Sequence, residues 1–203
     1  MITACLDLEG VLIPEVWVNV AEKTGIEKLK LTTRDIVDYN ELMTLRLKIV
    51  EEHGLTLQDI QEVISTLKPF DGAVEFLAWL REECQVLILS DTFEEFAIPF
   101  MRQLNMPCIF CHSLVVDEAG HIKDYKLRID DPKRRAVEAF QGLNYKIIAA
   151  GDSYNDTSML KAADQGIFFK PPASIAAQFP QFPVAQDYDA FKSEIQKAME
   201  RLK

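Results

Sequence analysis

The sequence has 203 residues, of which 48% are hydrophobic and 27% charged, the composition of an ordinary globular protein. Its 22 basic and 32 acidic side chains give a formal net charge of −10, which argues against broad electrostatic binding of nucleic acid and against adsorption to an anionic membrane. A chain of this length is expected to bury one core, as a single domain or as a domain with an insertion.

The amino-terminal residues do not have the pattern of an export signal. Residues 1–6 are apolar, but no basic region precedes them, and Asp7 and Glu9 interrupt the run at once. No apolar run approaches the roughly 18 residues that cross a bilayer. We therefore expect a cytoplasmic protein whose four cysteines are reduced thiols.

In chain order, the first predicted element is a short buried strand over residues 2–6. The stretch that follows reads as several helices, with the longest over 33–53, ended by Gly54, and another over 56–67, capped by Thr56. This stretch is far longer than a single crossover helix requires. We therefore interpret residues 14–69 as an inserted helical cap on a core formed by residues 1–13 and 70–203.

Beyond residue 70, short apolar runs alternate with amphipathic runs. They predict strands over 85–89, 146–150 and 166–169, a hairpin of 113–116 and 122–126, and helices over 72–83, 93–104, 132–140, 158–163 and 187–202, with Asp71 and Asp131 as candidate helix starts. Continuous apolar strands separated by helices are typical of a parallel sheet that is covered on both faces. The predicted fold class is α/β, with a doubly wound, Rossmann-like parallel sheet.

Polar residues follow three of the predicted strands. Asp7 and Glu9 follow the first strand, Ser90-Asp91-Thr92 the second, and Asp152 and Asp156 the third. Any one of them could merely cap the next helix. Because the carboxyl ends of parallel strands share one edge of a sheet, where ligands bind, we expect these residues to converge on a site.

The residue types at this edge point to phosphoryl transfer. Crowded carboxylates repel one another and need a cation or protons, and oxygen ligands of this kind suit Mg²⁺. A magnesium site beside a free carboxylate is suited to phosphoryl transfer to that carboxylate. Ser90 and the following amides could bind phosphate at a helix start. Lys133 could supply a cation, because a positive charge in the first helical turn is unfavourable without a local anionic partner.

The ordered set of Asp7-x-Glu9-Gly10-Val11, Ser90, Lys133 and Gly151-Asp152-x-x-Asn155-Asp156 resembles the four motifs of the haloacid dehalogenase (HAD) superfamily, over residues 1–170. The resemblance implies that Asp7 is a nucleophile that forms an aspartyl phosphate and that Glu9 is the general acid/base. It also implies phosphate contacts from Ser90, Lys133 and Asn155. The implied Mg²⁺ ligands are Asp7, the Glu9 backbone carbonyl and Asp152, with Asp156 supporting the metal shell.

The predicted cap narrows the resemblance. Residues 39–47, followed by Gly54-Leu55-Thr56, resemble the cap helix of phosphoserine phosphatases. The resemblance implies an arginine that binds the substrate carboxylate, for which Arg46 is the candidate and Arg34 the alternative. It also implies a glutamate that binds the amino group, for which Glu15 is the candidate. An arginine offers two parallel hydrogen bonds to a carboxylate. A solvated position is the alternative for both side chains.

Two positions depart from the usual phosphoserine phosphatase pattern. Glu9 stands where aspartate is usual, and its extra methylene moves the acid/base group by about 1.5 Å. Asp91-Thr92 replace the usual glycines, and Asp91 could orient an amino group or an alcohol acceptor, or cap the next helix. Together these features resemble the bacterial ThrH type, which implies phosphoserine as the substrate and homoserine as a second phosphoryl acceptor.

Other interpretations of the sequence remain open. Cys108-Ile109-Phe110-Cys111-His112 has the spacing of a haem attachment site or half a zinc site, but we expect a buried strand there, since neither an export signal nor a second cysteine pair accompanies it. The alternative functions are a HAD phosphatase for another small phosphomonoester, a phospho-aspartate switch, and a binding module without turnover.

Overall fold

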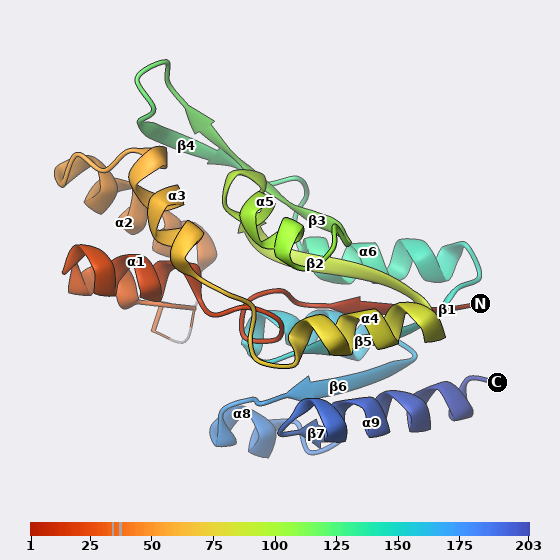
Figure 1. The fold of residues 1–203 in the computed structure, drawn as a ribbon. Helices are drawn as coiled ribbons and strands as arrows, with labels where there is room; N and C mark the ends of the chain where they lie inside the picture. The colour runs from red at the N-terminus through yellow and green to blue at the C-terminus, as the bar shows by residue number, and fades with distance from the viewer. Residues whose placement is uncertain (34, 37) are drawn as a thin grey trace.

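The computed structural model describes residues 1–33, 35–36 and 38–203 and has three layers, with helices on both faces of a central sheet (Figure 1). Within these residues the sheet has seven strands in the order β4-β3-β2-β1-β5-β6-β7. The strands are β1 (Ile2–Leu6), β2 (Gln85–Phe93), β3 (Cys108–Val116), β4 (Ile122–Lys126), β5 (Lys146–Gly151), β6 (Gln165–Phe169) and β7 (Val184–Ala185). Neighbouring strands are parallel apart from the β3–β4 hairpin. The predicted α/β fold with a doubly wound sheet is confirmed.

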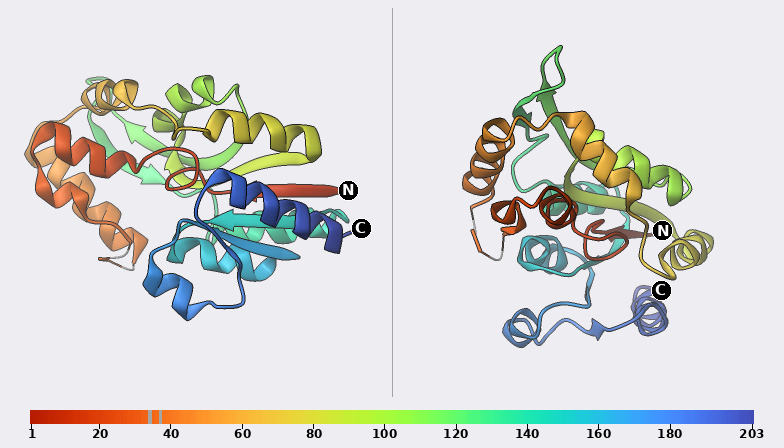
Figure 2. Two further views of the ribbon diagram at one scale, coloured as in Figure 1. Left: turned by 60° about the horizontal axis from the view of Figure 1, so that its bottom comes forward. Right: turned by 60° about the vertical axis from the view of Figure 1, so that its left-hand side comes forward.

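Two hydrophobic cores lie on opposite faces of the sheet, because successive strand residues point to opposite sides. Ile148 and Ala150 of β5 belong to one core, and Ile147 and Ala149 to the other. The first face is covered by α4 (Ala73–Glu83), α5 (Glu94–Gln103) and α9 (Tyr188–Arg201), and the second by α6 (Pro132–Gly142), α7 (Thr157–Ala162) and the short α8 (Ala173–Gln178) (Figure 2). The sheet is therefore buried on both sides, and its strand ends are left to form a site.

Residues 14–69, which lie between β1 and α4, contain several helices, as the sequence predicts. In its described part this segment comprises α1 (Val16–Thr24), the 3-10 helix η1 (Glu27–Lys30), α2 (Tyr39–Glu52) and α3 (Leu57–Thr66). In Figure 1, α1, α2 and α3 lie beyond the carboxyl ends of the strands, at the opposite end of the molecule from both chain termini. This segment therefore lies next to the sheet edge at which the polar residues gather.

The caps of these helices explain where the sequence-based boundaries succeed and fail. The helix predicted over 33–53 begins only at Tyr39, because the Asp38 side chain accepts hydrogen bonds from two backbone N–H groups of the first turn. The start of α3 agrees with the prediction. Thr56 and Asp59 form a capping box in which each side chain accepts a hydrogen bond from the other residue's backbone N–H.

Two aspartates that the sequence offers as helix starts do not cap their helices with side-chain hydrogen bonds. Gly72, rather than Asp71, is the N-cap of α4, with a φ of 85° that favours glycine. Asp131 is the N-cap of α6, but its side chain makes no capping bond and instead accepts hydrogen bonds from Arg134 and Ser158. The starts of α4 and α6 nevertheless lie within one residue of their predicted positions.

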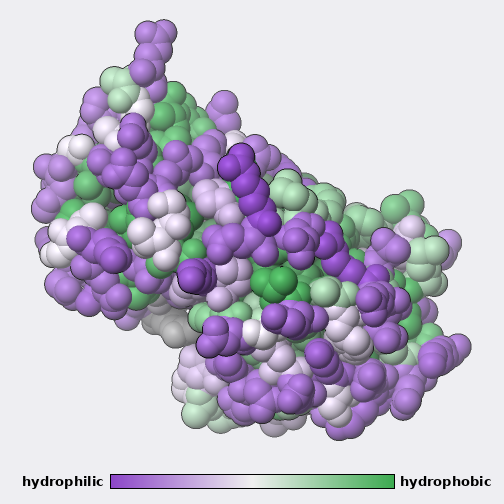
Figure 3. All heavy atoms as spheres, viewed as in Figure 1, coloured by the Kyte–Doolittle hydropathy of each residue, from purple (hydrophilic) through white to green (hydrophobic). Residues whose placement is uncertain are grey.

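The face of the molecule shown in Figure 3 is mostly hydrophilic, with hydrophobic residues in small groups between the polar ones. Such groups are ordinary, since a folded chain has too little polar surface to cover itself completely. No helix in the described part of the chain is both long and apolar enough to cross a membrane.

Candidate active site

The carboxyl ends of β1 and β5 lie side by side in the middle of the sheet. Asp7 follows β1, and Asp152 follows β5. The backbone N–H of Asp7 donates to the carbonyl of Ala150 at 2.9 Å, so strand pairing continues past β1 and holds Asp7 at the sheet edge. On one side of β1 the chain runs to β2 and β3, and on the other it runs to β5 and β6. Such a switch point is where doubly wound sheets bind ligands.

Acidic residues from these two strand ends form a buried cluster. Carboxylate oxygens of Asp7, Asp152 and Asp156 all lie within 4.8 Å of one another, and the three residues are buried. Burial, followed by the charge of Asp156, raises the pKa of Asp7, and Lys133 only partly opposes this rise. A divalent cation would relieve the repulsion, and a cluster of carboxylate oxygens fits Mg²⁺. The donor set therefore suits the cation that the sequence predicts.

Asp156 is the most constrained member of the cluster. Its Oδ2 accepts hydrogen bonds from the backbone N–H groups of Asp152 and Ser153 at 2.9 and 3.1 Å. Its Oδ1 accepts a hydrogen bond from Lys133 Nζ at 2.8 Å. Because three donors already contact its two oxygens, Asp156 is better suited to order the loop that carries Asp152 than to ligate a cation directly.

Two glycines make room for these carboxylates. A Cβ atom on Gly151 would lie 2.2 Å from Cγ of Asp156, and one on Gly10 would lie 2.5 Å from Cγ of Asp152. Gly10 also has a φ of 77°, a left-handed conformation that other residues adopt only with strain. The glycines of both motifs are therefore required because acidic side chains occupy the space that a larger residue would fill.

Lys133 reaches this cluster from the first turn of α6 and is only 2% exposed. Its Nζ lies 2.8 Å from Asp156, 3.0 Å from Asp7 and 3.4 Å from Asp91. Burial disfavours its charge, but these carboxylates outweigh burial and raise the pKa of Lys133. The side chain is thus a buried cation that offsets part of the acidic cluster, and not a solvated charge on a helix face.

Strand β2 bulges at its polar residues. Leu89 pairs with Phe110 and Phe93 pairs with His112, so residues 90–92 of β2 lie opposite a single residue of β3. A bulge of this kind turns side chains out of the regular strand alternation, often beside active sites. Ser90, Asp91 and Thr92 consequently line one pocket together with Asp7.

This bulge corrects two sequence-based expectations. The strand predicted to end at residue 89 continues to Phe93, and α5 begins only at Glu94. Ser90 therefore does not lie at a helix start, and Asp91 does not cap the following helix. The reason is that β2 pairs with β3 again beyond the bulge, which keeps the backbone extended.

Glu9 lies on the loop that follows Asp7, and its carboxylate faces the start of α1. Its Oε2 accepts a hydrogen bond from the backbone N–H of Val16 at 2.9 Å. Burial, followed by the charge of Glu15, raises the pKa of Glu9 to about 8, against the opposing effects of Val16, Arg46 and the Thr92 hydroxyl. A carboxyl that titrates near neutral pH is suited to give and take protons.

Arg46 points from α2 into the same pocket and is only 7% exposed. Its guanidinium lies over the ring of Trp17, 5.0 Å from the centroid, and donates a hydrogen bond to the carbonyl of Leu31 at 2.9 Å. Burial lowers the pKa of Arg46 to about 10, so the side chain is still charged at neutral pH. Its Nε is buried and has no hydrogen-bond partner among the described residues. Arg46 is thus a desolvated cation whose Nε–H group is available to a ligand.

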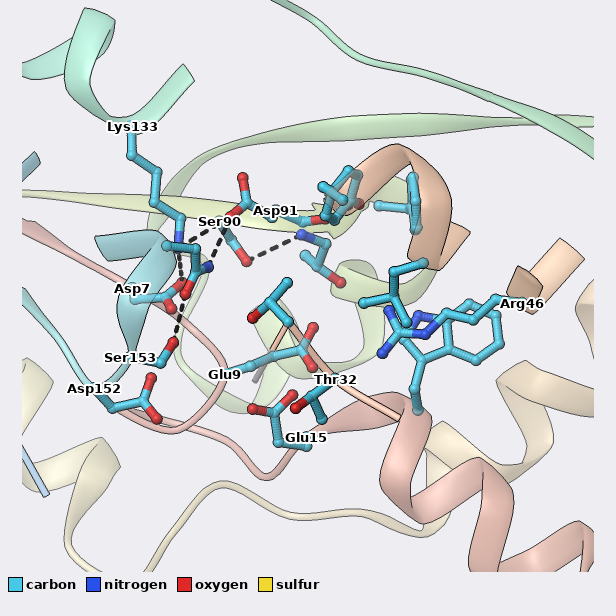
Figure 4. Close-up of a pocket in the computed structure, with 17 residues that line it drawn as sticks. Asp7, Glu9, Glu15, Thr32, Arg46, Ser90, Asp91, Lys133, Asp152 and Ser153 are labelled. Atoms are coloured by element: carbon cyan, nitrogen blue, oxygen red, sulfur yellow. Dashed lines mark hydrogen bonds and ion pairs between the residues drawn. The ribbon is translucent and has the colours of Figure 1, made fainter. Parts of the chain in front are cut away.

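The pocket has two ends that carry different side chains (Figure 4). Lys133, Asp7 and Ser90 lie at one end, with Asp152 and Ser153 close by, and Arg46 lies at the other. Glu9, Glu15 and Thr32 lie between the two ends. A molecule with an anionic group at each end would therefore meet a cation at each end.

The structure brings nearly all of the predicted site residues together. The pocket is lined by Asp7, Glu9, Glu15, Arg46, Ser90, Asp91, Lys133, Asp152 and Asn155, and Asp156 contacts it through Lys133. Arg34, the alternative to Arg46, lies outside the described residues. Trp17, Tyr39 and Ser153 also line the pocket. No motif assigns a role to these three residues. Trp17 and Tyr39 reach the pocket through the packing of α1 and α2, and Ser153 through the loop that follows β5.

The Cys108–His112 segment is part of β3, as the expectation of a strand requires. The four cysteines in the described part of the chain are free, and burial raises the pKa of Cys111 to about 12, which keeps it a neutral thiol. His112 is different, because it is buried and lies 3.7 Å from Asp91. The sequence does not single out this residue except as the end of a misleading motif.

The doubly wound sheet, with carboxylates and a buried lysine at its switch point, is the arrangement of a protein that carries out phosphoryl transfer. The family model for haloacid dehalogenase-like hydrolases matches residues 3–164, and the chain belongs to this family. Its resemblance to that family in sequence motifs is therefore confirmed.

Two curated proteins and a solved structure are similar to this protein over nearly the whole chain. Over 198 residues, 98% of this chain, it is 59% identical to the phosphoserine phosphatase ThrH of Pseudomonas aeruginosa, covering 97% of that protein. Over the same share of this chain it is 60% identical to a phosphoserine phosphatase of Pseudomonas syringae pv. tomato, covering 84% of that protein. The fold is also similar to the crystal structure of phosphoserine phosphatase from T. onnurineus, with a TM-score of 0.73 at 24% identity over 96% of this chain and 94% of that one.

Proposed function

We propose that the protein is a Mg²⁺-dependent phosphoserine phosphatase that acts through an aspartyl phosphate on Asp7. The observation that carries this proposal is the two-ended pocket, in which Lys133 and Ser90 lie at one end and the buried Arg46 at the other. Phosphoserine has a phosphate and a carboxylate that match these ends. The high identity to two phosphoserine phosphatases supports the same assignment.

Substrate binding follows from the charges of the pocket. Ser90, Lys133 and Asn155 would hold the phosphoryl group near Asp7. Arg46 would bind the substrate carboxylate, because the partnerless Nε and the desolvated guanidinium favour an anionic ligand. Glu15 would accept hydrogen bonds from the substrate ammonium group. The substrate would thus lie with its seryl oxygen between Asp7 and Glu9.

The first chemical step forms the covalent intermediate. A carboxylate oxygen of Asp7 attacks phosphorus, and the bond between phosphorus and the seryl oxygen breaks. Glu9 donates its proton to the leaving oxygen, a role that its raised pKa of about 8 supports because the carboxyl is protonated at neutral pH. Lys133, 3.0 Å from Asp7, partly opposes the effect of burial on the pKa of the nucleophile, and a divalent cation bound beside it would favour the ionised form further.

The second step releases the phosphoryl group. Glu9, now a carboxylate, takes a proton from water, whose oxygen attacks phosphorus while the bond to Asp7 breaks. An alcohol can replace water in the same position. Homoserine is one methylene longer than serine, and a pocket discriminates a single methylene by only about 1–3 kcal/mol. We therefore include transfer to homoserine in the proposal.

Asp7, Asp152 and the backbone carbonyl of Glu9 would hold Mg²⁺, with Asp156 ordering the loop beneath them. Bound there, the cation would supply charge stabilisation for the phosphoryl oxygens. Supporting this placement are the mutual distances of the acidic oxygens and the repulsion that raises the pKa of Asp7.

We also propose that residues 14–69 act as a cap on a core of residues 1–13 and 70–203, in a protein located in the cytoplasm. Two contacts support the division of roles. Tyr39 of α2 donates a hydrogen bond to the Asp91 carbonyl at 2.8 Å, and Thr56 forms an isolated antiparallel bridge with His121. The first contact supports a position of the helical segment beside the proposed phosphate site, where it would exclude water from the reaction, and the second joins the segment to the β3–β4 hairpin.

The decisive experiment incubates the protein with phosphoserine and Mg²⁺, with and without homoserine, and measures inorganic phosphate and phosphohomoserine together. We expect sustained phosphate release without homoserine, and phosphohomoserine when it is present. Absence of any product from phosphoserine would overturn the substrate assignment and favour another small phosphomonoester. A single phosphorylation event without turnover would instead indicate a phospho-aspartate switch.

A further inference from the structure

We propose that His112 is a positioning residue of the phosphate site, which acts through Asp91 on Lys133 and Asn155. The inference rests on the proposed function in taking this end of the pocket as the phosphate site. His112 lies on β3 directly after the single residue that faces the β2 bulge, and it is only 3% exposed. Its Nε2 lies 3.7 Å from Oδ1 of Asp91.

The tautomer of His112 is set by the backbone. Its Nδ1 accepts a hydrogen bond from the backbone N–H of Arg128 at 3.1 Å. A ring nitrogen that accepts a hydrogen bond carries no proton, so the neutral imidazole carries its proton on Nε2. That N–H faces the Asp91 carboxylate. The loop after β4 therefore orients His112, which in turn supports Asp91.

Asp91 is engaged by protein groups on both of its oxygens. In addition to His112 at Oδ1, its Oδ2 accepts a hydrogen bond from Asn155 Nδ2 at 2.8 Å and lies 3.4 Å from Lys133 Nζ. Burial opposes its ionisation, but Lys133, His112 and Asn155 together outweigh burial and lower the pKa of Asp91. The sequence placed Asp91 among the substrate-binding residues. These contacts favour a different role, in which a partly buried anion holds two phosphate-binding groups in place.

The groups that Asp91 holds need a fixed orientation. The ammonium of Lys133 has three N–H donors, and carboxylates of Asp7, Asp91 and Asp156 surround it. The amide of Asn155 is fixed at both ends, because its Oδ1 accepts a hydrogen bond from the Ser153 hydroxyl. Donors that are already aimed at a phosphoryl group stabilise developing charge without reorganising. Loss of the His112 N–H would free one side of Asp91 and loosen both donors.

Two substitutions separate the two nitrogens of His112. His112→Gln keeps an N–H donor at the position of Nε2, whereas His112→Asn keeps a polar atom only near Nδ1, where it can still accept from Arg128. Inorganic phosphate is the probe, and its dissociation constant in the presence of Mg²⁺ is measured by calorimetry. We expect His112→Asn to weaken phosphate binding about tenfold, the size of effect seen when outer supports of a site are lost. We expect His112→Gln to bind phosphate nearly as well as the unaltered protein.

A double substitution tests the route through Asp91. Asp91→Asn should weaken phosphate binding as His112→Asn does, and the combined variant should lose little more, because both changes break one chain of contacts. Losses that simply add would overturn the proposed route. The inference also fails if His112→Asn binds phosphate normally, or if both His112 variants lose binding equally while their melting temperatures fall in parallel.

Failure of the proposed function would look different from failure of this inference. If phosphoserine is not hydrolysed but phosphate binding still ranks His112→Gln above His112→Asn, the positioning role stands and the substrate assignment fails. Nitrogen-15 NMR of the imidazole gives an independent readout in the unaltered protein. A proton on Nε2 supports the proposed geometry, and a proton on Nδ1 overturns it.

Discussion

Substitution of Gly10 by alanine tests whether the close approach of Asp152 is needed for cation binding. The new Cβ would lie 2.5 to 2.7 Å from three atoms of the Asp152 carboxylate, well inside van der Waals contact. The carboxylate would have to rotate away, because the backbone at Gly10 is tied to Ile13 by a hydrogen bond of 2.9 Å. The substitution therefore moves a proposed Mg²⁺ ligand without changing any acidic residue.

The magnitude follows from two separate effects. A left-handed conformation costs a residue with a Cβ about 1–2 kcal/mol. In a chain of this size, that cost lowers the melting temperature by roughly 2–8 °C. Displacement of Asp152 adds a second effect, which we expect to raise the Mg²⁺ concentration for half-maximal activity by about tenfold or more.

Gly25 provides the matched control. Its φ of 73° is nearly that of Gly10, but a Cβ there would meet no atom within 4 Å. Gly25→Ala should therefore lose similar stability and keep the normal Mg²⁺ requirement. Both variants are assayed by thermal unfolding and by Mg²⁺ titration of phosphoserine hydrolysis. Equal Mg²⁺ requirements in the two variants would refute the role given to Asp152.

The remaining predictions concern other parts of the chain. Asp7→Asn should abolish turnover of phosphoserine, and full activity in that variant would sink the aspartyl-phosphate scheme. Arg46→Ala should lower kcat/KM for phosphoserine by about 10–100-fold, the effect of losing a hydrogen bond to a charged group. Hydrolysis of phosphoethanolamine, which lacks the carboxylate, should be affected much less. Equal losses for the two substrates would contradict carboxylate recognition by Arg46. Lys133→Met leaves the buried carboxylates of Asp7 and Asp156 and the partly buried one of Asp91 without their cation, so denaturant unfolding in a chelator should show a loss of about 3–5 kcal/mol. The Phe76 ring stacks on the Phe191 ring with their centroids 4.7 Å apart. Phe76→Ala should lower the free energy of unfolding by about 3–5 kcal/mol and leave kcat unchanged well below the melting temperature. A change in kcat without a loss of stability would show that this core is coupled to the site.

Much of the fold could be predicted from local sequence patterns. A strand buried on both faces is apolar along most of its length, and the runs at 2–6, 85–89 and 146–150 show this pattern. The Thr56 cap of α3 was equally visible, because a capping box involves residues only three positions apart. The start of α2 was not, since apolar periodicity continues before Tyr39 and only the Asp38 cap ends it.

The site was predictable to the extent that its residues follow strand ends. Asp7, Asp152 and Ser90 could be grouped because parallel strands deliver their carboxyl ends to one edge. Lys133 could be included because a positive charge in the first turn of a helix indicates a local anionic partner, although its sequence position did not show which carboxylates it contacts. The bulge of β2 and the partners of Asp91 could not be foreseen, because they depend on how β3 pairs with β2.

Residue order by itself determined the doubly wound sheet, the acidic strand ends and the excess negative charge of this protein, because each of these depends on residue identity or short spacing. Tertiary structure alone decided that His112 lies beside Asp91 and that Arg46 is buried over Trp17. It also decided that the Asp152 carboxylate occupies the space beside Gly10. These contacts join residues from different elements. Their distances depend on packing and strand register, which no single stretch of the sequence encodes.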